Sequence, residues 1–268
     1  MDGRALKDKL LGLPLGAVRY YDQLGSTNDV AAQWAKVGCP HLALVVADEQ
    51  TAGRGRMSRH WFTPPGTALA FSLVLRPSEL QLEGEAVARI SGLGGLAICE
   101  ALNKDLPTTI PAQIKWPNDV IVARRKLAGV LVETQWQAND LQAVILGIGI
   151  NVAPDSVPRH GKLRFPATCI QTVLERPVDR WDFLYEVLNQ ILRLMPSLTS
   201  QEFTIAWQRN LAFQNELVLA YLDDQSPLEG QLTGLNQDGS LRFRTLTGEE
   251  MTLQFGEIML RPVDRMKK

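Results

Sequence analysis

The spacing of apolar and polar residues predicts a helix, a strand and a long loop early in the chain. Ser26-Thr27-Asn28 provides residue types that favour a helix N-terminus, and apolar positions then recur about every 3.6 residues, so a helix should begin near residue 27. The β-branched apolar run at 42–47 predicts a strand. The segment 51–65 combines glycines, cationic side chains and a Pro-Pro pair, which is typical of a surface loop.

After this loop, strands and helices continue along the chain. Residues 66–75 alternate small and large apolar side chains like a half-buried strand, whereas residues 85–103 have helical spacing that Gly94-Gly95 weakens locally. This part of the chain therefore mixes helices with a mostly antiparallel sheet, and we assign it to the α+β class. Further patterns predict strands at 112–116, 126–134 and 142–150, a hairpin connection at 122–126, and helices at 178–195 and 200–210.

The pattern changes from Leu217 onward, where short apolar segments alternate with polar turns. Such spacing is typical of a small β-barrel of about fifty residues. We therefore expect two domains, a large one at 1–213 and a small C-terminal one at 214–268. The turns are predicted at Asp223-Asp224, Asn236-Gln237-Asp238-Gly239 and Thr247-Gly248-Glu249.

The composition is that of an ordinary globular protein, with 45% hydrophobic residues in a chain of 268. The 28 basic and 29 acidic residues nearly cancel, so no overall charge attracts DNA or an anionic membrane, and we expect neither as a partner. No stretch approaches the roughly 18 consecutive apolar residues of a membrane span, and residues 1–15 lack the apolar core of a signal peptide. These features favour a cytoplasmic location.

The cysteines and histidines do not predict a metal site. Cys39, Cys99 and Cys169 are far apart and form no CxxC pair, which is typical of reduced thiols in or near a core. His41, His60 and His160 lack the spacing of metal ligands. We therefore expect no metal bound by protein side chains.

Three arginines in the loop 53–61 form the first candidate site. Glycine permits close approach of the backbone to an anion, and the guanidinium groups of Arg54, Arg56 and Arg59 could pair with phosphate oxygens. A solvated cationic loop without a ligand would have the same composition. The loop alone leaves both interpretations open.

A lysine at the end of an apolar strand forms the second candidate site. Lys115-Trp116-Pro117-Asn118-Asp119 places a cation, an amide and a carboxylate around a proline turn, which could stabilise charge in a transition state. A lysine that extends its ammonium group to solvent, beside an ordinary Asx turn, is the alternative.

Two predicted strands contain glycines, in the segments 126–133 and 147–151. A glycine inside a strand marks a close approach of a ligand or of another backbone, although a bulge or a packing contact is the more common reason. The sequence Gly147-Ile148-Gly149 is not a dinucleotide fingerprint, because the third glycine and the following helix are missing.

Taken together and in this order, the motifs resemble the catalytic core of the biotin protein ligase family. The likeness extends from about residue 20 to residue 263. It implies a catalytic domain of helices around a mixed sheet, shared with lipoate ligases, and an SH3-like barrel after it. It is carried by Ser26-Thr27-Asn28, Gln50, Ala52-Gly53-Arg54-Gly55-Arg56, Arg59, Trp61, Lys115-Trp116-Pro117-Asn118-Asp119, Lys126-Leu127-Ala128-Gly129, Gly147-Ile148-Gly149-Ile150-Asn151 and Gly256-Glu257-Ile258.

The resemblance implies a two-step reaction with ATP and biotin as substrates and Mg²⁺ as the metal. Biotin and ATP would form biotinyl-AMP, and the biotinyl group would then pass to a lysine of the biotin carboxyl carrier protein of acetyl-CoA carboxylase. A lipoate or octanoate ligase on the same fold is one alternative, and a non-catalytic biotin sensor is another. Gln50 and the intact arginine loop favour biotin over lipoate, and Lys115 favours an enzyme over a sensor.

The resemblance also implies a role for each residue. Lys115 would bridge the biotin carboxylate and the α-phosphate, and Arg54 and Arg56 would be the other catalytic cations. The implied biotin-binding residues are Ser26, Thr27, Asn28, Gln50, Gly53, Arg54, Arg56, Lys115, Gly129, Gly147 and Gly149. The implied nucleotide-binding residues are Arg56, Arg59, Trp61, Lys115, Asn118, Asn151, Glu257 and Arg261.

Two departures from the family pattern affect these expectations. Ser58 stands where the family loop usually has glycine, so the flexibility or closed conformation of the loop should differ. The sequence starts at the catalytic core, so we expect a monofunctional ligase without an N-terminal DNA-binding domain. A homodimer stays open as an alternative, because an exposed sheet edge can pair with a second copy.

Overall fold

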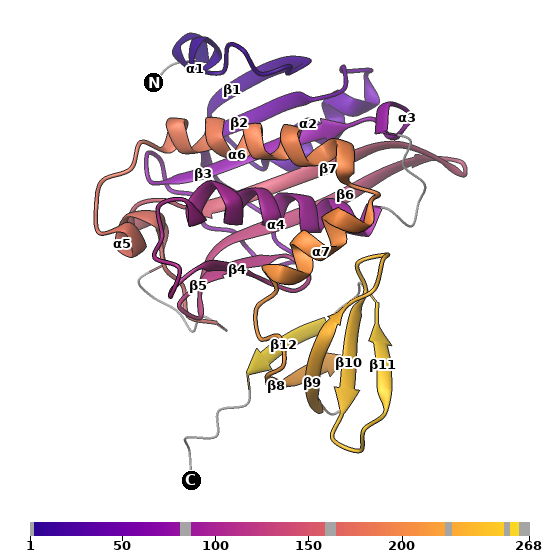
Figure 1. Cartoon of the computed structure of the whole chain (residues 1–268). Coiled ribbons are helices and arrows are strands. Elements are labelled where there is room, and N and C mark those ends of the chain that lie inside the picture. The colour runs from indigo at the N-terminus through magenta and orange to yellow at the C-terminus, as the bar shows by residue number, and fades with distance from the viewer. Residues whose placement is uncertain (1–2, 81–86, 159–164, 223–226, 255–257, 263–268) are drawn as a thin grey trace.

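The computed structural model describes residues 3–80, 87–158, 165–222, 227–254 and 258–262, which form two β-sheets with helices around the larger one (Figure 1). The larger sheet has seven strands and the C-terminal sheet has five. In the described part of the chain, no helix combines the length and apolar character needed to cross a membrane.

The seven-stranded sheet has the strand order β1-β2-β3-β7-β6-β5-β4. Strands β1 and β2 pair in parallel, and every other neighbouring pair is antiparallel. The predicted mixed, mostly antiparallel sheet of an α+β fold is confirmed. Its strands are β1 (Ala17–Leu24), β2 (Ala43–Gln50), β3 (Ala68–Leu75), β4 (Ala112–Lys115), β5 (Asp119–Val122), β6 (Arg125–Gln137) and β7 (Asp140–Asn151).

Helices cover the two faces of this sheet, and neighbouring residues of one strand therefore enter different hydrophobic clusters. In β2, Leu44 and Val46 pack in the main core with α4 (Val87–Asn103) and α6 (Arg180–Leu194). Val45 packs instead under α2 (Thr27–Lys36) on the opposite face. Because side chains alternate across a strand, a strand covered on both faces reads as one continuous apolar run.

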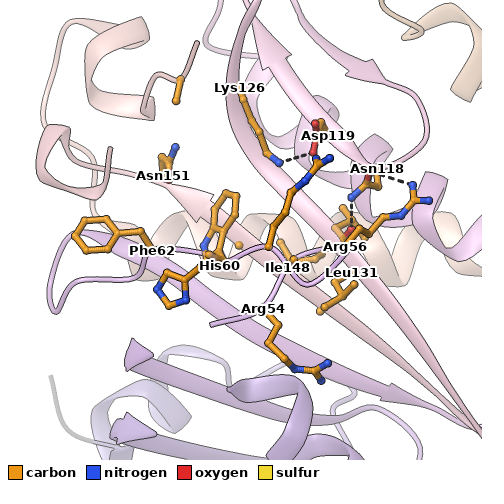
Figure 2. Close-up of a pocket in the computed structure, with 18 of the residues that line it drawn as sticks. Arg54, Arg56, His60, Phe62, Asn118, Asp119, Lys126, Leu131, Ile148 and Asn151 are labelled. Atoms are coloured by element: carbon orange, nitrogen blue, oxygen red, sulfur yellow. Dashed lines mark hydrogen bonds and ion pairs between the residues drawn. The ribbon is translucent and has the colours of Figure 1, made fainter. Parts of the chain in front are cut away.

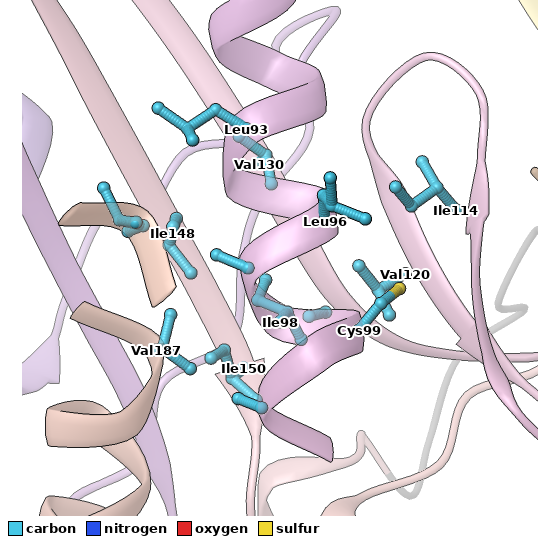
Figure 3. Packing of buried hydrophobic residues seen from close by; sticks show 14 of the residues in the cluster. Leu93, Leu96, Ile98, Cys99, Ile114, Val120, Val130, Ile148, Ile150 and Val187 are labelled. Atoms are coloured by element: carbon cyan, nitrogen blue, oxygen red, sulfur yellow. The ribbon is translucent and has the colours of Figure 1, made fainter. Parts of the chain in front are cut away.

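Helix α4 lies directly on the sheet, and its glycine pair permits the close approach (Figure 3). A Cβ on Gly94 would lie 3.0 Å from Val130, and one on Gly95 would lie 3.3 Å from Ile114. The predicted helix is confirmed from Val87 onward, and its first predicted residues lie outside the described ones. Fully burying a large aliphatic side chain such as Leu93 stabilises the fold by about 1.5–3 kcal/mol.

Side chains cap the helices α6 and α7 (Gln201–Arg209). The Asp179 carboxylate accepts hydrogen bonds from the backbone N–H groups of Trp181 and Asp182 at the start of α6. The Ser200 hydroxyl accepts one from Phe203 at the start of α7. The remaining helices are α1 (Gly3–Lys9), α3 (Pro77–Leu80) and α5 (Ile170–Leu174), with short 3₁₀ helices at Pro154–Ser156 and Met195–Ser197.

The sequence did not predict the helices α1, α3 and α5 or the strands β1 and β5. Strand β1 has no fully buried position, because it lies at the edge of the sheet, so its apolar alternation is weak. Strand β5 has only four residues and directly follows the turn at Pro117. The hairpin connection predicted at 122–126 is confirmed and joins β5 to β6, with Ala123 and Arg124 at φ 47° and 59°, as a tight hairpin turn requires.

The C-terminal sheet is entirely antiparallel, with the order β11-β10-β9-β8-β12. The predicted short strands are confirmed, but the predicted closed barrel is wrong for the described residues, since β11 and β12 form two open edges. Hydrophobic periodicity finds strands but does not indicate whether the first and last ones pair. The strands are β8 (Leu217–Leu222), β9 (Leu228–Leu235), β10 (Leu241–Thr245), β11 (Glu250–Leu253) and β12 (Ile258–Pro262).

One turn of the C-terminal sheet contacts the larger part of the molecule. The Trp116 indole N–H donates to the Gly239 carbonyl over 3.0 Å, and this contact is buried. Arg89 of α4 donates to the carbonyls of Leu198, at 2.9 Å, and Gln237. The β9–β10 turn therefore packs against Trp116, the residue that directly follows Lys115 at the end of β4.

Candidate active site

A cavity of about 860 Å³ lies on the face of the large sheet that α2 covers. Its floor is formed by Gly129 and Leu131 of β6 and by Gly147 and Gly149 of β7. These positions alternate with residues such as Val130, which face the main core. The volume is within the range of pockets that bind small molecules.

Glycines in the floor leave room for side chains that cross it. A Cβ on Gly147 would overlap the side-chain oxygen of Asn28, and one on Gly149 would overlap the indole of Trp61. Gly129 and Gly149 face each other across β6 and β7. Side chains of α2 and of the arginine loop therefore approach these glycines closely, which is the packing contact that the sequence offered as the alternative to a ligand or another backbone.

One end of the cavity is a buried polar corner. The Thr27 backbone N–H and hydroxyl donate to Gln50 Oε1 at 2.8 and 3.1 Å, and Gln50 Nε2 donates to the Thr63 hydroxyl at 3.1 Å. Ser26 is the N-cap residue of α2, but its side chain makes no capping hydrogen bond and lines the cavity. The bonds between Thr27 and Gln50 hold amide and hydroxyl groups in fixed positions, as recognition of a polar ring requires.

The arginine loop folds back on itself as a short hairpin. The Trp61 N–H donates to the Gly53 carbonyl at 2.8 Å, and the Gly55 N–H donates to the Arg59 carbonyl at 2.7 Å. At its tip, Ser58 has φ 54°, in the left-handed region that costs a residue with a Cβ about 1 kcal/mol. The glycine usual in the family would adopt this conformation without that cost.

Two lysines share one buried carboxylate at the other end of the cavity. Lys126 Nζ lies 2.5 Å from Asp119 Oδ1, and Lys115 Nζ lies 3.4 Å from Oδ2 (Figure 2). Burial by itself would raise the pKa of Asp119, but the two ammonium groups outweigh burial and lower this pKa to about 2. Two cations against one carboxylate leave this end of the cavity positive.

The loop arginines Arg54 and Arg56 have different surroundings. Arg56 lies near Asn118, with Nη1 3.4 Å from Asn118 Oδ1, while Asn118 Nδ2 donates to the Val130 carbonyl at 2.8 Å. Arg54 instead pairs with Glu133 and Asp29, and hydrogen bonding to Glu133 raises the pKa of its guanidinium. In Figure 2, Arg54 points away from Arg56 and Asn118.

Trp61 packs at the centre of the cavity floor. Its indole lies against Gly149, and the Lys126 ammonium group is 5.3 Å from the ring centroid. The indole N–H is buried without a hydrogen-bond partner in the described structure. A buried donor without a partner is costly, so packing of the indole against the glycine floor must offset this cost.

A third group of residues borders the cavity beyond Trp61. Asn151 is 5% exposed, and its Nδ2 donates to the Thr168 carbonyl at 3.0 Å. The Phe165 ring lies 5.2 Å from the Lys115 ammonium group. Residues 155–158 complete this side.

Most of the residues singled out in the sequence line this one cavity. Gly53 lies at the base of the loop, where its carbonyl accepts the Trp61 N–H, and is not part of the lining. Arg261 is in β12 of the C-terminal sheet, and Glu257 lies outside the described residues. The lining includes Ser26, Thr27, Asn28, Gln50, Arg54, Arg56, Arg59, Trp61, Lys115, Asn118, Gly129, Gly147, Gly149 and Asn151.

Several residues that build the cavity had no role assigned from the sequence. Lys126 and Asp119 belong to two motifs that carry the family resemblance, so the sequence did contain a signal for both residues. Ser72 is the one polar residue of the strand Ala68–Leu75, and its hydroxyl lies 2.6 Å from Asn28 Oδ1. Glu133 binds Asn28 and the loop, and its charge within the strand 126–134 was the available signal.

The fold and the cavity define a class of protein that binds a small molecule on a mixed sheet beside a cationic loop. The chain belongs to the biotin/lipoate A/B protein ligase family, whose model matches residues 20–151. A biotin–[acetyl-CoA-carboxylase] ligase of Paracoccus denitrificans is 33% identical over 232 residues, which cover 84% of this chain and 93% of the relative.

Other similar proteins are longer or have known structures. The bifunctional ligase/repressor BirA of Bacillus subtilis is 35% identical over 183 residues, and the match spans 54% of its length. The chain therefore spans about half the length of this relative. The biotin protein ligase of Aquifex aeolicus, solved in complex with biotin and ATP, is 28% identical and superimposes with a TM-score of 0.77 over 92% of this chain and 99% of that one.

Proposed function

We propose that this chain is an ATP-dependent biotin protein ligase. In the first step a biotin carboxylate oxygen attacks the α-phosphorus of ATP, which forms biotinyl-AMP and releases pyrophosphate. In the second step a lysine amine attacks the carbonyl carbon of this mixed anhydride and AMP leaves. The observation that carries the proposal is a single cavity with a polar corner at one end and two lysines at the other.

The polar corner fits the ureido ring of biotin. Thr27 and Gln50 offer hydroxyl and amide groups that their mutual hydrogen bonds fix before a ligand arrives, and the Ser26 side chain lines the same corner. Asn28 and the glycine floor, Gly129, Gly147 and Gly149, would enclose the ring and the acyl chain. A rigid pocket loses little conformational entropy on binding.

The cationic end fits the reacting anions. A carboxylate and a phosphate repel each other, so their approach requires positive charge between them. Lys115 would bridge them, Lys126 would provide the second ammonium group, and Asp119 would hold both lysines in place. Arg56 and Arg59 would contact the phosphates from the loop.

The nucleotide would occupy the side of the cavity that contains Asn151 and Trp61. Asn118 would support Arg56 on the opposite side. Arg261 of β12 stays a proposed nucleotide contact, and so does Glu257, which lies outside the described residues. A closed loop would also keep water away from the anhydride.

Mg²⁺ is the metal we propose for the first step. Among the described residues, no group of three or more His, Cys, Asp or Glu side chains could hold a metal ion. Asp119, one of the carboxylates that line the cavity, already pairs with two lysines. These residues suit an ion that is held by phosphates and water, where it would neutralise charge on the triphosphate.

We propose residues 1–213 as the catalytic domain, residues 214–268 as an accessory C-terminal domain, and the biotin carboxyl carrier protein of acetyl-CoA carboxylase as the acceptor. The names of the similar ligases support this acceptor. A cytoplasmic location, a homodimer and the absence of specific DNA binding stay predictions.

The decisive experiment is exchange of labelled pyrophosphate into ATP, measured with biotin, with lipoate and with neither. Biotin-dependent exchange is the expected result, because the first step is reversible. Exchange with lipoate alone would indicate the alternative ligase of the same family. No exchange with either acid would overturn the proposed reaction.

A further inference from the structure

One carboxylate joins the arginine loop to the polar corner of the cavity. Glu133 of β6 accepts two hydrogen bonds from Arg54, with Nη1–Oε1 and Nη2–Oε2 distances of 2.8 and 2.7 Å. The same Glu133 Oε2 accepts a hydrogen bond from Asn28 Nδ2 at 2.6 Å. Asn28 Oδ1 in turn accepts from the buried Ser72 hydroxyl at 2.6 Å. Glu133 therefore connects Arg54 of the loop to Asn28 of the polar corner.

The second end of the loop is tied to the same corner. Gln50 accepts from Thr27, and its amide donates to Thr63, which follows the loop. The backbone N–H of Gln50 also donates to the Thr63 carbonyl at 3.3 Å. The loop thus has two attachment points on one hydrogen-bond network, Glu133 for its first arginine and Gln50 for the residue that follows it.

The charges around Arg54 do not suit a phosphate. Arg54 Nη2 also lies 2.6 Å from Asp29 Oδ1, so two carboxylates surround one guanidinium group. An anion brought to Arg54 would meet net negative charge, whereas the lysine pair at Asp119 offers net positive charge. Figure 2 shows Arg54 pointing away from the labelled residues Lys126 and Asp119.

We propose that Glu133 is a positioning residue and that Arg54 acts as an anchor of the loop, without contacting the phosphates. The bidentate pair fixes the direction in which the loop leaves β2, and through Asn28 it couples that direction to the polar corner. Paired hydrogen bonds between a guanidinium and a carboxylate fix geometry better than a single contact. The effect on catalysis rests on the proposed function, but the effect on the loop does not.

The first test uses the ligand-free protein and needs no activity. Glu133→Gln and Arg54→Gln should each speed trypsin cleavage after Arg56 and Arg59 by about fivefold, because the loop opens more often without the ion pair. The double variant should be cleaved no faster than either single one. Glu250→Gln, which breaks the exposed Arg244–Glu250 pair of the C-terminal sheet, is the matched control and should leave loop cleavage unchanged.

Cleavage at the remaining sites and the melting temperature report whether a variant has lost its fold as a whole. Loop cleavage at the wild-type rate in both Glu133→Gln and Arg54→Gln would overturn the proposal. Cleavage that rises equally at every site would overturn it too, since the pair would then support the whole fold and not the loop.

The second test separates anchoring from direct phosphate contact by pyrophosphate exchange. Both single variants should raise the KM for biotin by a similar factor, about tenfold, with a much smaller fall in kcat, and the double variant should match them. A large loss of kcat in Arg54→Gln that Glu133→Gln does not share would overturn the proposal, because Arg54 would then act on the reacting groups. If the wild type exchanges no pyrophosphate, the proposed function fails and the cleavage test still decides the role of Glu133.

Discussion

Gly147 of β7 faces Asn28 of α2 so closely that any side chain on Gly147 would occupy the position of the Asn28 amide oxygen. Asn28 is 3% exposed and is held by Ser72 and Glu133, so it has little freedom to move away. The absence of a side chain in β7 thus determines how closely α2 approaches the sheet, and with it the shape of the polar corner.

Gly147→Ala should weaken biotin binding by about tenfold or more. The added methyl group must displace the Asn28 side chain, and overpacking of this kind costs about 1–3 kcal/mol. Isothermal titration with biotin measures the effect. Gly25→Ala is the control, because a Cβ at Gly25 meets no atom within 4 Å. Wild-type affinity in Gly147→Ala would contradict the proposed position of the ureido ring.

Lys115→Ala should nearly abolish adenylation while biotin binding is much less affected. Removing a cation that stabilises transition-state charge costs on the order of 3–4 kcal/mol, or a few hundredfold in rate. Pyrophosphate exchange measures the loss, and Lys104→Ala, at an exposed pair with Glu186, is the control. An exchange rate within about tenfold of wild type would rule out the bridging role of Lys115.

The Asp119 carboxylate should stabilise the fold in a pH-dependent way. The pKa of Asp119 is lowered from its ordinary value of 3.8 to about 2 in the folded protein, so the folded state favours the charged form. This stabilisation is present above pH 3.8 and is lost as the pH falls through about 2. Urea unfolding of wild type and Asp119→Asn should therefore differ less in free energy at pH 2 than at pH 5. A difference that grows on acidification would contradict the assignment.

Biotin together with ATP should protect the loop from trypsin. Arg54, Arg56 and Arg59 lie in an exposed or half-exposed hairpin that two glycines loosen, and charge-assisted hydrogen bonds to phosphate, worth about 1.5–3 kcal/mol each, would stabilise its closed form. Mass spectrometry of the fragments measures cleavage at each arginine. Equal cleavage with and without the two ligands would exclude ligand-induced ordering.

Trp116→Phe should destabilise the protein by about 1–3 kcal/mol, because the buried Gly239 carbonyl loses its donor. Chemical denaturation measures the change. Trp136→Phe is the control, since the Trp136 side chain is 54% exposed. Stability equal to wild type in Trp116→Phe would mean that the hydrogen bond from Trp116 to the β9–β10 turn contributes nothing to the free energy of unfolding.

Local patterns were sufficient for most helices and strands. The helices α2 and α6 have strong apolar periodicity, because each packs one face against a core, and the buried strands β2 and β3 stand out as continuous apolar runs. Strand β1 escaped prediction because it lies at an edge without a fully buried residue. The open form of the described C-terminal sheet could not be predicted from periodicity either, because pairing between distant strands does not change the apolar pattern of either strand.

The motifs determined which residue types meet in the cavity, and their order along the chain determined the family. Only the tertiary structure decided which of those charged residues pair with one another. Lys115 and Lys126 share Asp119, whereas Arg54 is separated from Arg56 by its pairing with Glu133 and Asp29. Arg54 and Glu133 are 79 positions apart, and they interact because side-chain alternation along β6 places Glu133 on the cavity face and the loop hairpin brings Arg54 to it. A pairwise contact of this kind depends on three-dimensional distance, which no single residue type or local spacing encodes.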